Sequence, residues 1–199
     1  MTYAIIGSGN VGSALATLFV RAGVAVSIAN TRGPDALAGL TEALGPTVHP
    51  VTLEEALDSD VIFMAIPFGA VERFGRSLPD WTGKTVVDTT NAHHTPNWAE
   101  ILGGRTSSRY TAEHLPGAAV VKAFNQLPAN VLAAELEPGA GRRVIFLAAD
   151  DPAAADRITK LIEALGLAAV QLGRLDDGGR LIQAPHGIVL RNFLERPLF

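Results

Sequence analysis

The chain has 199 residues, of which 48% are hydrophobic and 18% are charged, and its formal net charge is −4. This length suits one domain with a substantial core, and the composition excludes an intrinsically disordered chain. The mild negative charge argues against a general nucleic-acid binder. Because the sequence has no cysteine, it excludes disulfides, thiol catalysis and cysteine-ligated metal centres.

The opening residues MTYAIIG lack the cationic segment and the cleavage site of a secretory signal. Apolar runs in the sequence stay well short of the ~20 residues that a membrane-spanning helix needs. We therefore expect a soluble cytoplasmic protein whose partners include neither nucleic acid nor membrane.

Strand and helix patterns alternate from the first residues onward. Tyr3–Ile6 is the first predicted strand, and a helical pattern follows it until Gly23, which is placed to end the helix. The apolar face of this helix consists of Val11, Ala14, Leu15, Leu18 and Phe19. Further strands are predicted at Ala25–Ala29, Thr47–Val51, Val61–Ile66, Thr85–Asp88, Ala119–Phe124, Val144–Ala148 and Ala168–Leu172. Several are almost wholly apolar, which is typical of parallel strands covered on both faces.

Two later helices begin with recognisable caps. Thr52 and Glu55 have the spacing of a capping box, and Asp151 stands before Pro152 as an N-cap residue stands before a first-turn proline. Between these helices, the polar stretch from Asn91 to Tyr110 is predicted to be a long irregular loop, and such loops are often functional. The alternation as a whole predicts an α/β fold with a doubly wound, mainly parallel Rossmann-type sheet and helices on both faces.

A glycine-rich turn joins the first strand to the first helix. Gly7-Ser8-Gly9-Asn10-Val11-Gly12 matches the pattern G-x-G-x-x-G in the strand-to-helix context that gives the pattern its meaning. Gly7 would permit the tight turn. Gly9 would allow a phosphate to approach backbone N–H groups, and Gly12 would allow the helix to pack closely on the strand. Open N–H groups and the helix dipole favour an anion, so we expect a dinucleotide site. The alternative is an ordinary turn in which the glycines serve geometry alone.

With this motif, residues 1–199 are predicted to form a single NAD(P)-binding domain, in which residues 126–199 extend the same sheet. The second predicted strand then indicates which coenzyme binds. An NAD site usually has Asp or Glu after this strand, whereas the chain has Asn30, Thr31 and Arg32. Arg32 can pair with a 2′-phosphate, and Asn30 and Thr31 can donate hydrogen bonds to it. The sequence favours NADP(H), against the alternative of a solvated arginine in a turn.

Residues that follow the fourth to sixth strands would lie near a bound nicotinamide, because ligands of such sheets bind beyond the carboxyl ends of the strands. Small or apolar walls are offered by Ala65, Ile66, Pro67 and Leu127. Asn91 and Asn125 could orient an amide or a substrate carbonyl. The alternative is that the apolar residues belong to the core and the asparagines form turns.

Metal and acid–base chemistry have little support in the sequence. It has no nucleophile elbow and no histidine pair at metal-ligand spacing, and its histidines are scattered at His49, His93, His94, His114 and His186. Lys122, in the sixth strand, is expected to reach solvent. We therefore assign no metal and leave the catalytic residues unknown, since hydride transfer between two rings depends mainly on their proximity.

Seven segments follow one another over nearly the whole chain: AIIGSGNVGSALA, NTRGP, VIFMAIPF, VVDTTNA, VVKAFNQLPANVL, GRRVIFLAADDPAA and GGRLIQAP. In these segments the sequence resembles the NADP oxidoreductase family, coenzyme F420-dependent type. The resemblance implies a compact and usually dimeric Rossmann-type domain that holds NADPH through the glycine loop, Thr31 and Arg32. It also implies that nicotinamide and deazaflavin meet near Ala65–Pro67, Asn91 and an acceptor site at Phe124, Asn125, Leu127 and Leu181.

The electron acceptor stays open at this point. The leading hypothesis is hydride transfer between NADP(H) and a deazaflavin (coenzyme F420) or a flavin. One alternative is a non-catalytic NADP(H)-binding redox sensor or partner-binding protein. Another is a small-molecule or ferric reductase, completed across a dimer by the apolar tail around Val189–Leu198. The short segment LIQAPHGIVLRNFLERPLF lacks a large helical domain, which suits a planar acceptor in an open cleft.

Overall fold

The computed structural model describes residues 1–185 and 187–196, so His186 and the predicted tail residue Leu198 lie outside the described part. The nine strands of the described residues form one sheet, in the order β3-β2-β1-β4-β5-β6-β7-β8, with β9 paired to β7. Their bounds are β1 Tyr3–Ile6, β2 Val26–Ala29, β3 Val48–Pro50, β4 Val61–Met64, β5 Thr85–Asp88, β6 Ala119–Ala123, β7 Arg142–Ala149, β8 Ala168–Gln171 and β9 Leu194–Glu195.

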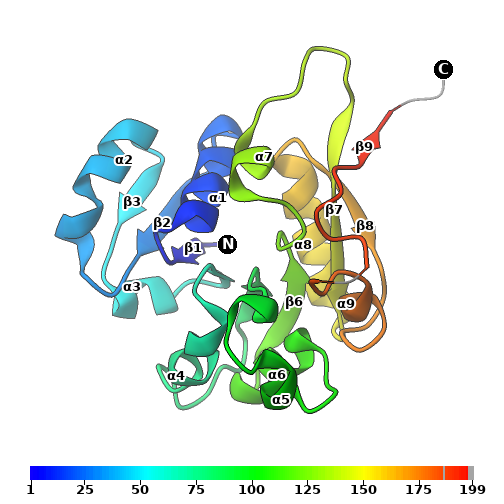
Figure 1. The fold of residues 1–199 in the computed structure, drawn as a ribbon. Helices are drawn as coiled ribbons and strands as arrows, with labels where there is room; N and C mark the ends of the chain where they lie inside the picture. The colour runs from blue at the N-terminus through cyan, green and yellow to red at the C-terminus, as the bar shows by residue number, and fades with distance from the viewer. Residues whose placement is uncertain (186, 197–199) are drawn as a thin grey trace.

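Strand direction changes at one place in this path. Strands β1 to β6 are parallel, β7 runs antiparallel to β6, and β8 is again parallel to β7. Because β7 runs in reverse, it begins at the edge where β6 ends. The expected doubly wound, mainly parallel α/β sheet is confirmed, with helices on both of its faces (Figure 1).

The helices are α1 Asn10–Arg21, α2 Ala38–Leu44, α3 Leu53–Leu57, α4 Val71–Gly75, α5 Trp98–Leu102, α6 Ser107–His114, α7 Ala129–Ala133, α8 Pro152–Ala164 and α9 Gly178–Leu181, with 3₁₀ turns η1 Pro34–Leu37, η2 Phe68–Ala70 and η3 Ala92–His94. The predicted caps are confirmed. Thr52 and Glu55 form a reciprocal capping box at α3, and the Asp151 carboxylate accepts from Ala154 N at 2.9 Å at α8.

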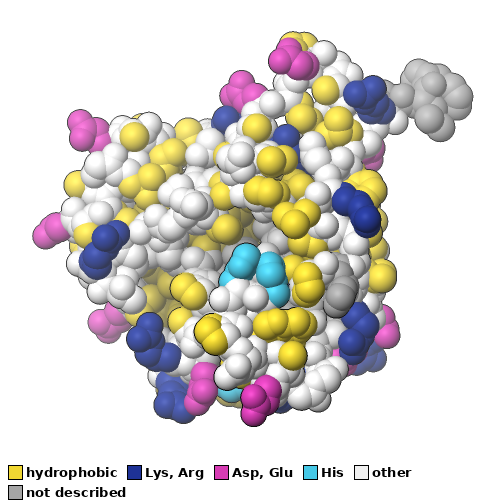
Figure 2. Space-filling model, viewed as in Figure 1, with side chains coloured by type: hydrophobic (Ala, Val, Ile, Leu, Met, Phe, Trp, Pro, Cys, Tyr) yellow, Lys and Arg dark blue, Asp and Glu magenta, His cyan; other side chains and the backbone are white. Residues whose placement is uncertain are grey.

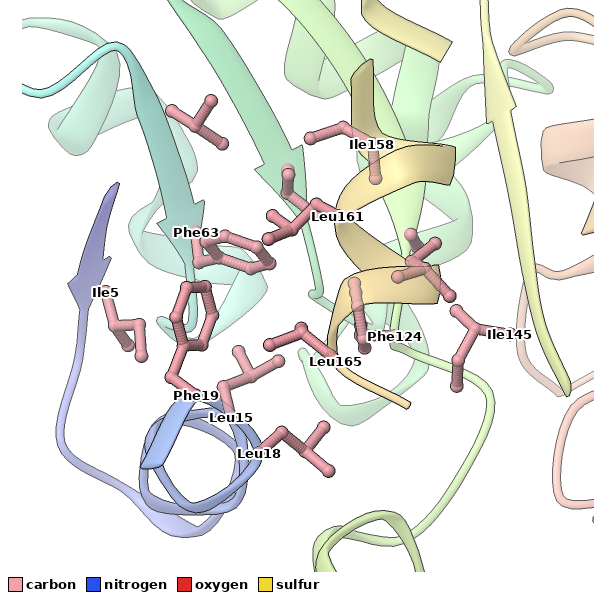
Figure 3. Packing of buried hydrophobic residues seen from close by; sticks show 14 of the residues in the cluster. Ile5, Leu15, Leu18, Phe19, Phe63, Phe124, Ile145, Ile158, Leu161 and Leu165 are labelled. Carbon is pink, nitrogen blue, oxygen red and sulfur yellow. The ribbon is translucent and has the colours of Figure 1, made fainter. Parts of the chain in front are cut away.

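The core lies on both faces of the sheet, because alternate strand residues point to opposite sides. On one face Phe19 contacts Phe63, and Phe63 contacts Phe124, with ring centroids 5.4 and 5.7 Å apart. Figure 3 shows these rings between α1 and the leucines and isoleucines of α8. The other face holds Trp81, which is fully buried and whose indole N–H donates to Gly75 O at 2.9 Å.

The stretch from Asn91 to Tyr110 corrects the sequence prediction, since η3, α5 and the first half of α6 replace the expected irregular loop. Its polar residues are used as caps. The Thr106 hydroxyl accepts from Arg109 N at 3.1 Å and begins α6, and the Arg105 guanidinium donates to the Leu102 and Ile101 carbonyls at the end of α5. Polar composition alone does not distinguish such capped short helices from a loop.

Lys122 also corrects the prediction, because it does not reach solvent. Its side chain and that of Asp88 are 0% exposed, and Nζ lies 3.2 Å from the Asp88 carboxylate. Lys122 also donates to the Thr90 carbonyl, while Asp88 accepts from Thr90 N and from the Thr111 hydroxyl, each at 2.9 Å. Burial lowers the pKa of Lys122, and the Asp88 charge opposes this shift. The pair fixes the turn that follows β5.

Candidate functional site

The three glycines of the loop after β1 have different surroundings. Gly7 has φ +114°, and a Cβ there would lie 2.2 Å from the Ala65 carbonyl oxygen. A Cβ on Gly12 would lie 1.9 Å from the Gly7 carbonyl oxygen. A Cβ on Gly9 would meet nothing within 4 Å. Gly7 and Gly12 are therefore required by packing, whereas the space beside Gly9 is open.

Helix α1 starts at this open space without a protein cap. Gly9 is the N-cap residue, no side chain bonds the first turn, and that turn has no acidic residue. The first backbone N–H groups of a helix have no partner within the helix and carry the positive end of its dipole. This terminus can therefore bind an anionic group such as a pyrophosphate.

A cavity of about 470 Å³ extends from the glycine loop to the end of β2. Its lining includes Gly7, Ser8, Gly9, Asn30, Thr31 and Arg32. The two loops are joined by the Asn30 side chain, whose amide donates to Ser8 Oγ at 3.0 Å and whose oxygen accepts from Arg32 N at 2.8 Å. Asn30 thus organises this pocket through both ends of its amide.

Arg73 on α4 lines the same cavity, and the sequence reading missed it. Within the described residues, neither the Arg32 nor the Arg73 guanidinium has an ion pair or a hydrogen bond, and the lining contains no carboxylate. The sequence gives little indication of a binding role for Arg73, because a surface arginine on a short helix is common. Two unpaired cations give this end of the site a positive character suited to a phosphate.

A second cavity of about 600 Å³ continues from the first, since both are lined by Gly9, Ala65, Ile66 and Pro67. It brings together the predicted residues Asn10, Val11, Asn91, Asn125 and Leu127. Its far wall includes Val189 and Leu190 from the end of the described chain. Leu190 N donates to Gln126 O at 2.7 Å, which anchors this wall beside β6. The two cavities form one groove along the carboxyl edge of the sheet.

Asn91 and Asn125 are hydrogen-bonded to each other in the wall of this second cavity. Asn91 Nδ2 donates to the Asn125 backbone oxygen at 2.8 Å, and Asn125 Nδ2 donates to Asn91 Oδ1 at 3.0 Å and to Ile182 O at 2.6 Å. These bonds fix the orientation of the Asn125 amide. They leave its Oδ1 enclosed and without a hydrogen-bond donor.

Buried side-chain nitrogen and oxygen atoms without a partner are found, in the described part of the chain, at Thr90 Oγ1, His93 Nδ1 and Asn125 Oδ1. All three residues line the second cavity. Enclosed polar groups without partners cost stability and are uncommon in folded proteins. Their concentration around one cavity indicates a place for a polar ligand.

The histidines beside this cavity lie against apolar surface. Figure 2 shows histidine surface near the centre of one face of the molecule, bordered by hydrophobic side chains. The His93 and His94 ring centroids are 3.8 Å apart. Burial lowers the pKa of His93, and the neighbouring His94 lowers it further. No group of three His, Asp or Glu residues that could hold a metal occurs within residues 1–185 and 187–196.

Two predicted acceptor residues lie outside the cavity lining. Phe124 is 1% exposed and belongs to the core, where it adopts a positive φ of 60° at the end of β6. Leu181 on α9 is 51% exposed and does not line either cavity.

Over the described residues, no helix is both long and apolar enough to span a bilayer.

The fold and this groove define a Rossmann-type dinucleotide-binding protein. Comparison with known proteins makes the class more specific. The model of the family described as "NADP oxidoreductase coenzyme F420-dependent" matches residues 2–92. This match assigns residues 2–92 to an NADP-dependent oxidoreductase family.

Three similar proteins align with the chain beyond residue 92. The hypothetical protein SMa0349 from Sinorhizobium meliloti shares 43% identity and a TM-score of 0.92, over 98% of this chain and 96% of that chain. Metalloreductase STEAP3 from Rattus norvegicus is 33% identical over 174 residues, which cover 86% of this chain. The chain spans 33% of the length of that metalloreductase.

The third is a protein from Arthrobacter sp. FB24 described provisionally as an F420-dependent NADP reductase. It has a TM-score of 0.68 at 22% identity, over 88% of this chain and 86% of that chain. At this identity the likeness shows the fold alone.

Proposed function

We propose that this protein is an NADPH-dependent oxidoreductase that transfers a hydride between NADP(H) and a deazaflavin or flavin-type acceptor. The observation that carries the proposal is the continuous groove, with a glycine loop and two unpaired arginines at one end and unpartnered polar atoms beside apolar walls at the other. This arrangement offers the cationic end and the apolar end that a phosphorylated nicotinamide dinucleotide needs.

The glycine loop would hold the pyrophosphate of the coenzyme. The open space beside Gly9 admits a phosphate close to the start of α1, where backbone N–H groups can donate to it. Thr31 and Arg32 would bind the 2′-phosphate, and Arg73 adds a second positive charge to the same cavity. The described lining contains no carboxylate, which would repel that phosphate.

The nicotinamide ring would lie against Ala65, Ile66 and Pro67, which both cavities share. Asn125 Oδ1 and Thr90 Oγ1 lie enclosed and without partners beside this space, and a turn of either side chain toward the cavity would let it bond the carboxamide. When bound, NADPH supplies the hydride. The chain itself holds the ring, excludes water from one of its faces, and leaves the other face toward the second cavity.

An acceptor would occupy the rest of the second cavity, between the nicotinamide face and the wall that includes Leu127, Val189 and Leu190. A planar ring fits such an apolar wall. The names of the relatives, an F420-dependent NADP reductase and a metalloreductase, are consistent with an acceptor that carries electrons onward. A redox sensor that binds NADP(H) without turnover is the second candidate, because no acidic residue among those described lines the second cavity to act as a proton donor.

Coenzyme titration and an acceptor panel test the proposal. NADPH should bind more tightly than NADH, and its absorbance should decline when F420, FMN or FAD is added and stay constant without an acceptor. Binding without oxidation by F420, FMN, FAD, menadione or ferric citrate would favour the sensor. Failure to bind either NADPH or NADP⁺ would refute both functions. The homodimer and the cytoplasmic location stay predictions, to be checked by light scattering and by fractionation of the producing cell.

A further inference from the structure

His93 lies at a defined place in the second cavity. It belongs to the 3₁₀ turn η3. This turn packs on η2, the 3₁₀ turn that comes after β4 in the chain. The ring shares the cavity lining with Pro67 and Phe68 on one side and with Asn125 on another. It therefore lies beside the space that the proposed acceptor would occupy, outside the stretch that binds the pyrophosphate.

The two ring nitrogens of His93 differ in their surroundings. Nδ1 is enclosed and has no hydrogen-bond partner. Nε2 has no partner among the described residues either, but it is not among the enclosed atoms, so it is open to the cavity. Buried N–H groups without an acceptor are rarer than buried acceptors without a donor. This favours the tautomer that carries its single proton on Nε2.

The surroundings also keep the ring neutral. Burial is the main cause of the lowered pKa of His93, and the charge of His94 adds to it. The turn η2 that packs against it, Phe68–Ala70, carries no titratable side chain, and the titratable group of α5 is the exposed Glu100. Within residues 1–185 and 187–196, no carboxylate lines the cavity to stabilise an imidazolium.

We propose that His93 is a catalytic residue of the proposed reaction, whose neutral imidazole donates a hydrogen bond from Nε2 to the acceptor atom that gains the electron pair. The acceptor is accordingly a planar conjugated molecule with a C=O or C=N group in its reducible system, such as a deazaflavin, a flavin or a quinone. A bare ferric ion offers no such atom. This inference rests on the proposed function and specifies the acceptor class.

The hydride leaves NADPH with both electrons of its C–H bond and forms a new bond to the acceptor, and NADP⁺ results. A π bond of the acceptor opens toward its oxygen or nitrogen, which then carries the negative charge. His93 Nε2–H stabilises that charge by a hydrogen bond, and water delivers the final proton. A neutral donor of this kind keeps its proton throughout.

Three variants test the role: His93→Phe keeps the ring shape and removes the donor, His93→Gln keeps an N–H donor, and His49→Gln is a control on the distant strand β3. Steady-state oxidation of NADPH is measured with F420, FMN and menadione. Loss of a single donor to a developing charge typically lowers kcat by about 10²–10³-fold, and we expect His93→Phe to lie in or near this range. His93→Gln should recover a large part of kcat, while the NADPH Kd and the thermal midpoint stay near wild type.

The pH profile separates a neutral donor from an acid. The wild-type kcat should stay level from pH 7 to 9, because the neutral ring is the active form. A kcat that falls tenfold for each pH unit would identify an imidazolium acid and overturn the proposal. So would a His93→Phe variant with normal kcat, or a His93→Gln variant as slow as His93→Phe. If the wild type binds NADPH but reduces none of the three acceptors, the proposed function fails together with this inference.

Discussion

At the scale of single residues, a methyl group added to the glycine loop would meet a different neighbour at each position. The Cβ of an alanine at Gly12 would overlap the Gly7 carbonyl oxygen, whereas at Gly9 it would enter open space. A substitution therefore lowers the stability of the fold where protein atoms occupy the space, and lowers ligand affinity where a ligand would occupy it. This difference separates the binding role of the loop from its packing role.

Gly9→Ala should weaken NADPH binding and leave the fold intact. The added Cβ would occupy the space of a phosphate, and we expect a loss of about tenfold in affinity or more, equivalent to roughly 1.4 kcal/mol. Gly12→Ala is the matched comparison, because its clash with backbone should lower stability by about 1–3 kcal/mol. NADPH titration by fluorescence and urea unfolding measure the two effects. A Gly9→Ala variant with wild-type affinity would remove the phosphate from this position.

Arg32→Ala should reduce the affinity for NADPH and spare that for NADH. A charge-assisted bond contributes about 1.5–3 kcal/mol, so NADPH binding should fall by roughly tenfold to a hundredfold. Arg73→Ala should act in the same direction, since both arginines line one cavity. Arg76→Ala is the control, because Arg76 is exposed, pairs with Glu72 and lies outside this lining. Equal losses for the two coenzymes would show that Arg32 does not contact the 2′-phosphate.

At the scale of elements, β5 and β6 are joined by a buried ion pair as well as by their ladder. Asp88 and Lys122 are directly opposite in the register of the two strands, and both also bond Thr90. Thr89, Thr90 and Asn91 form the turn that lines the second cavity. The ion pair therefore holds a wall of the site without touching the ligand space.

Lys122→Met should destabilise the protein strongly. Removing one partner leaves the Asp88 charge buried and unpaired, which typically costs about 3–5 kcal/mol. The double variant Asp88→Asn, Lys122→Met removes both charges and should cost less than the sum of the single variants, with a coupling of about 0.5–3 kcal/mol. Urea unfolding of the four proteins in the cycle gives this number. Additive losses would mean that the two side chains do not interact.

Features that depend on neighbouring residues can be predicted from the sequence. The capping box at Thr52, the N-cap at Asp151 and the glycine loop each involve residues three to five positions apart, so the pattern contains the whole interaction. The strands and their order follow from apolar runs and short connections. These local signals explain why the fold class and the position of the nucleotide groove follow from the sequence.

Features that depend on distant partners cannot be predicted in this way. The position of Lys122 is determined by Asp88, 34 positions earlier, and that of Arg73 by a cavity shared with the end of β2. Phe124 follows the same rule, because its burial depends on Phe63. The short helices between Asn91 and Tyr110 could not be predicted either. Their polar residues look like those of a loop, because the hydrogen bonds by which they cap the helices form only in the folded chain.

At the scale of the whole molecule, segments far apart in sequence are held together around one sheet. Arg109 on α6 donates to Asp150 after β7 and to Asp176 before α9, at 2.7 Å in each case. The aromatic series Phe19, Phe63 and Phe124 runs across three elements of the same core face (Figure 3). The early and late parts of the described chain therefore have no separate cores.

A single cooperative unfolding transition is expected from this arrangement. Trp81 reports one face of the sheet, so its fluorescence should change at the same urea concentration as the far-ultraviolet circular dichroism of the whole chain. NADPH at about 100 times its Kd should stabilise the folded state by about 2.7 kcal/mol in both signals. Two separate midpoints would show that the segment after β6 unfolds independently.

The reversal of β7 has a consequence for how this protein can diversify. Because β7 starts at the carboxyl edge of the sheet and pairs there with β9, residues as late as Leu190 reach the groove. The family match ends at residue 92, just before His93 and well before Asn125, Leu127 and the last wall. Under the proposed function, substitutions in the later segments would reshape the acceptor space and leave the glycine loop, Arg32 and Arg73 unchanged.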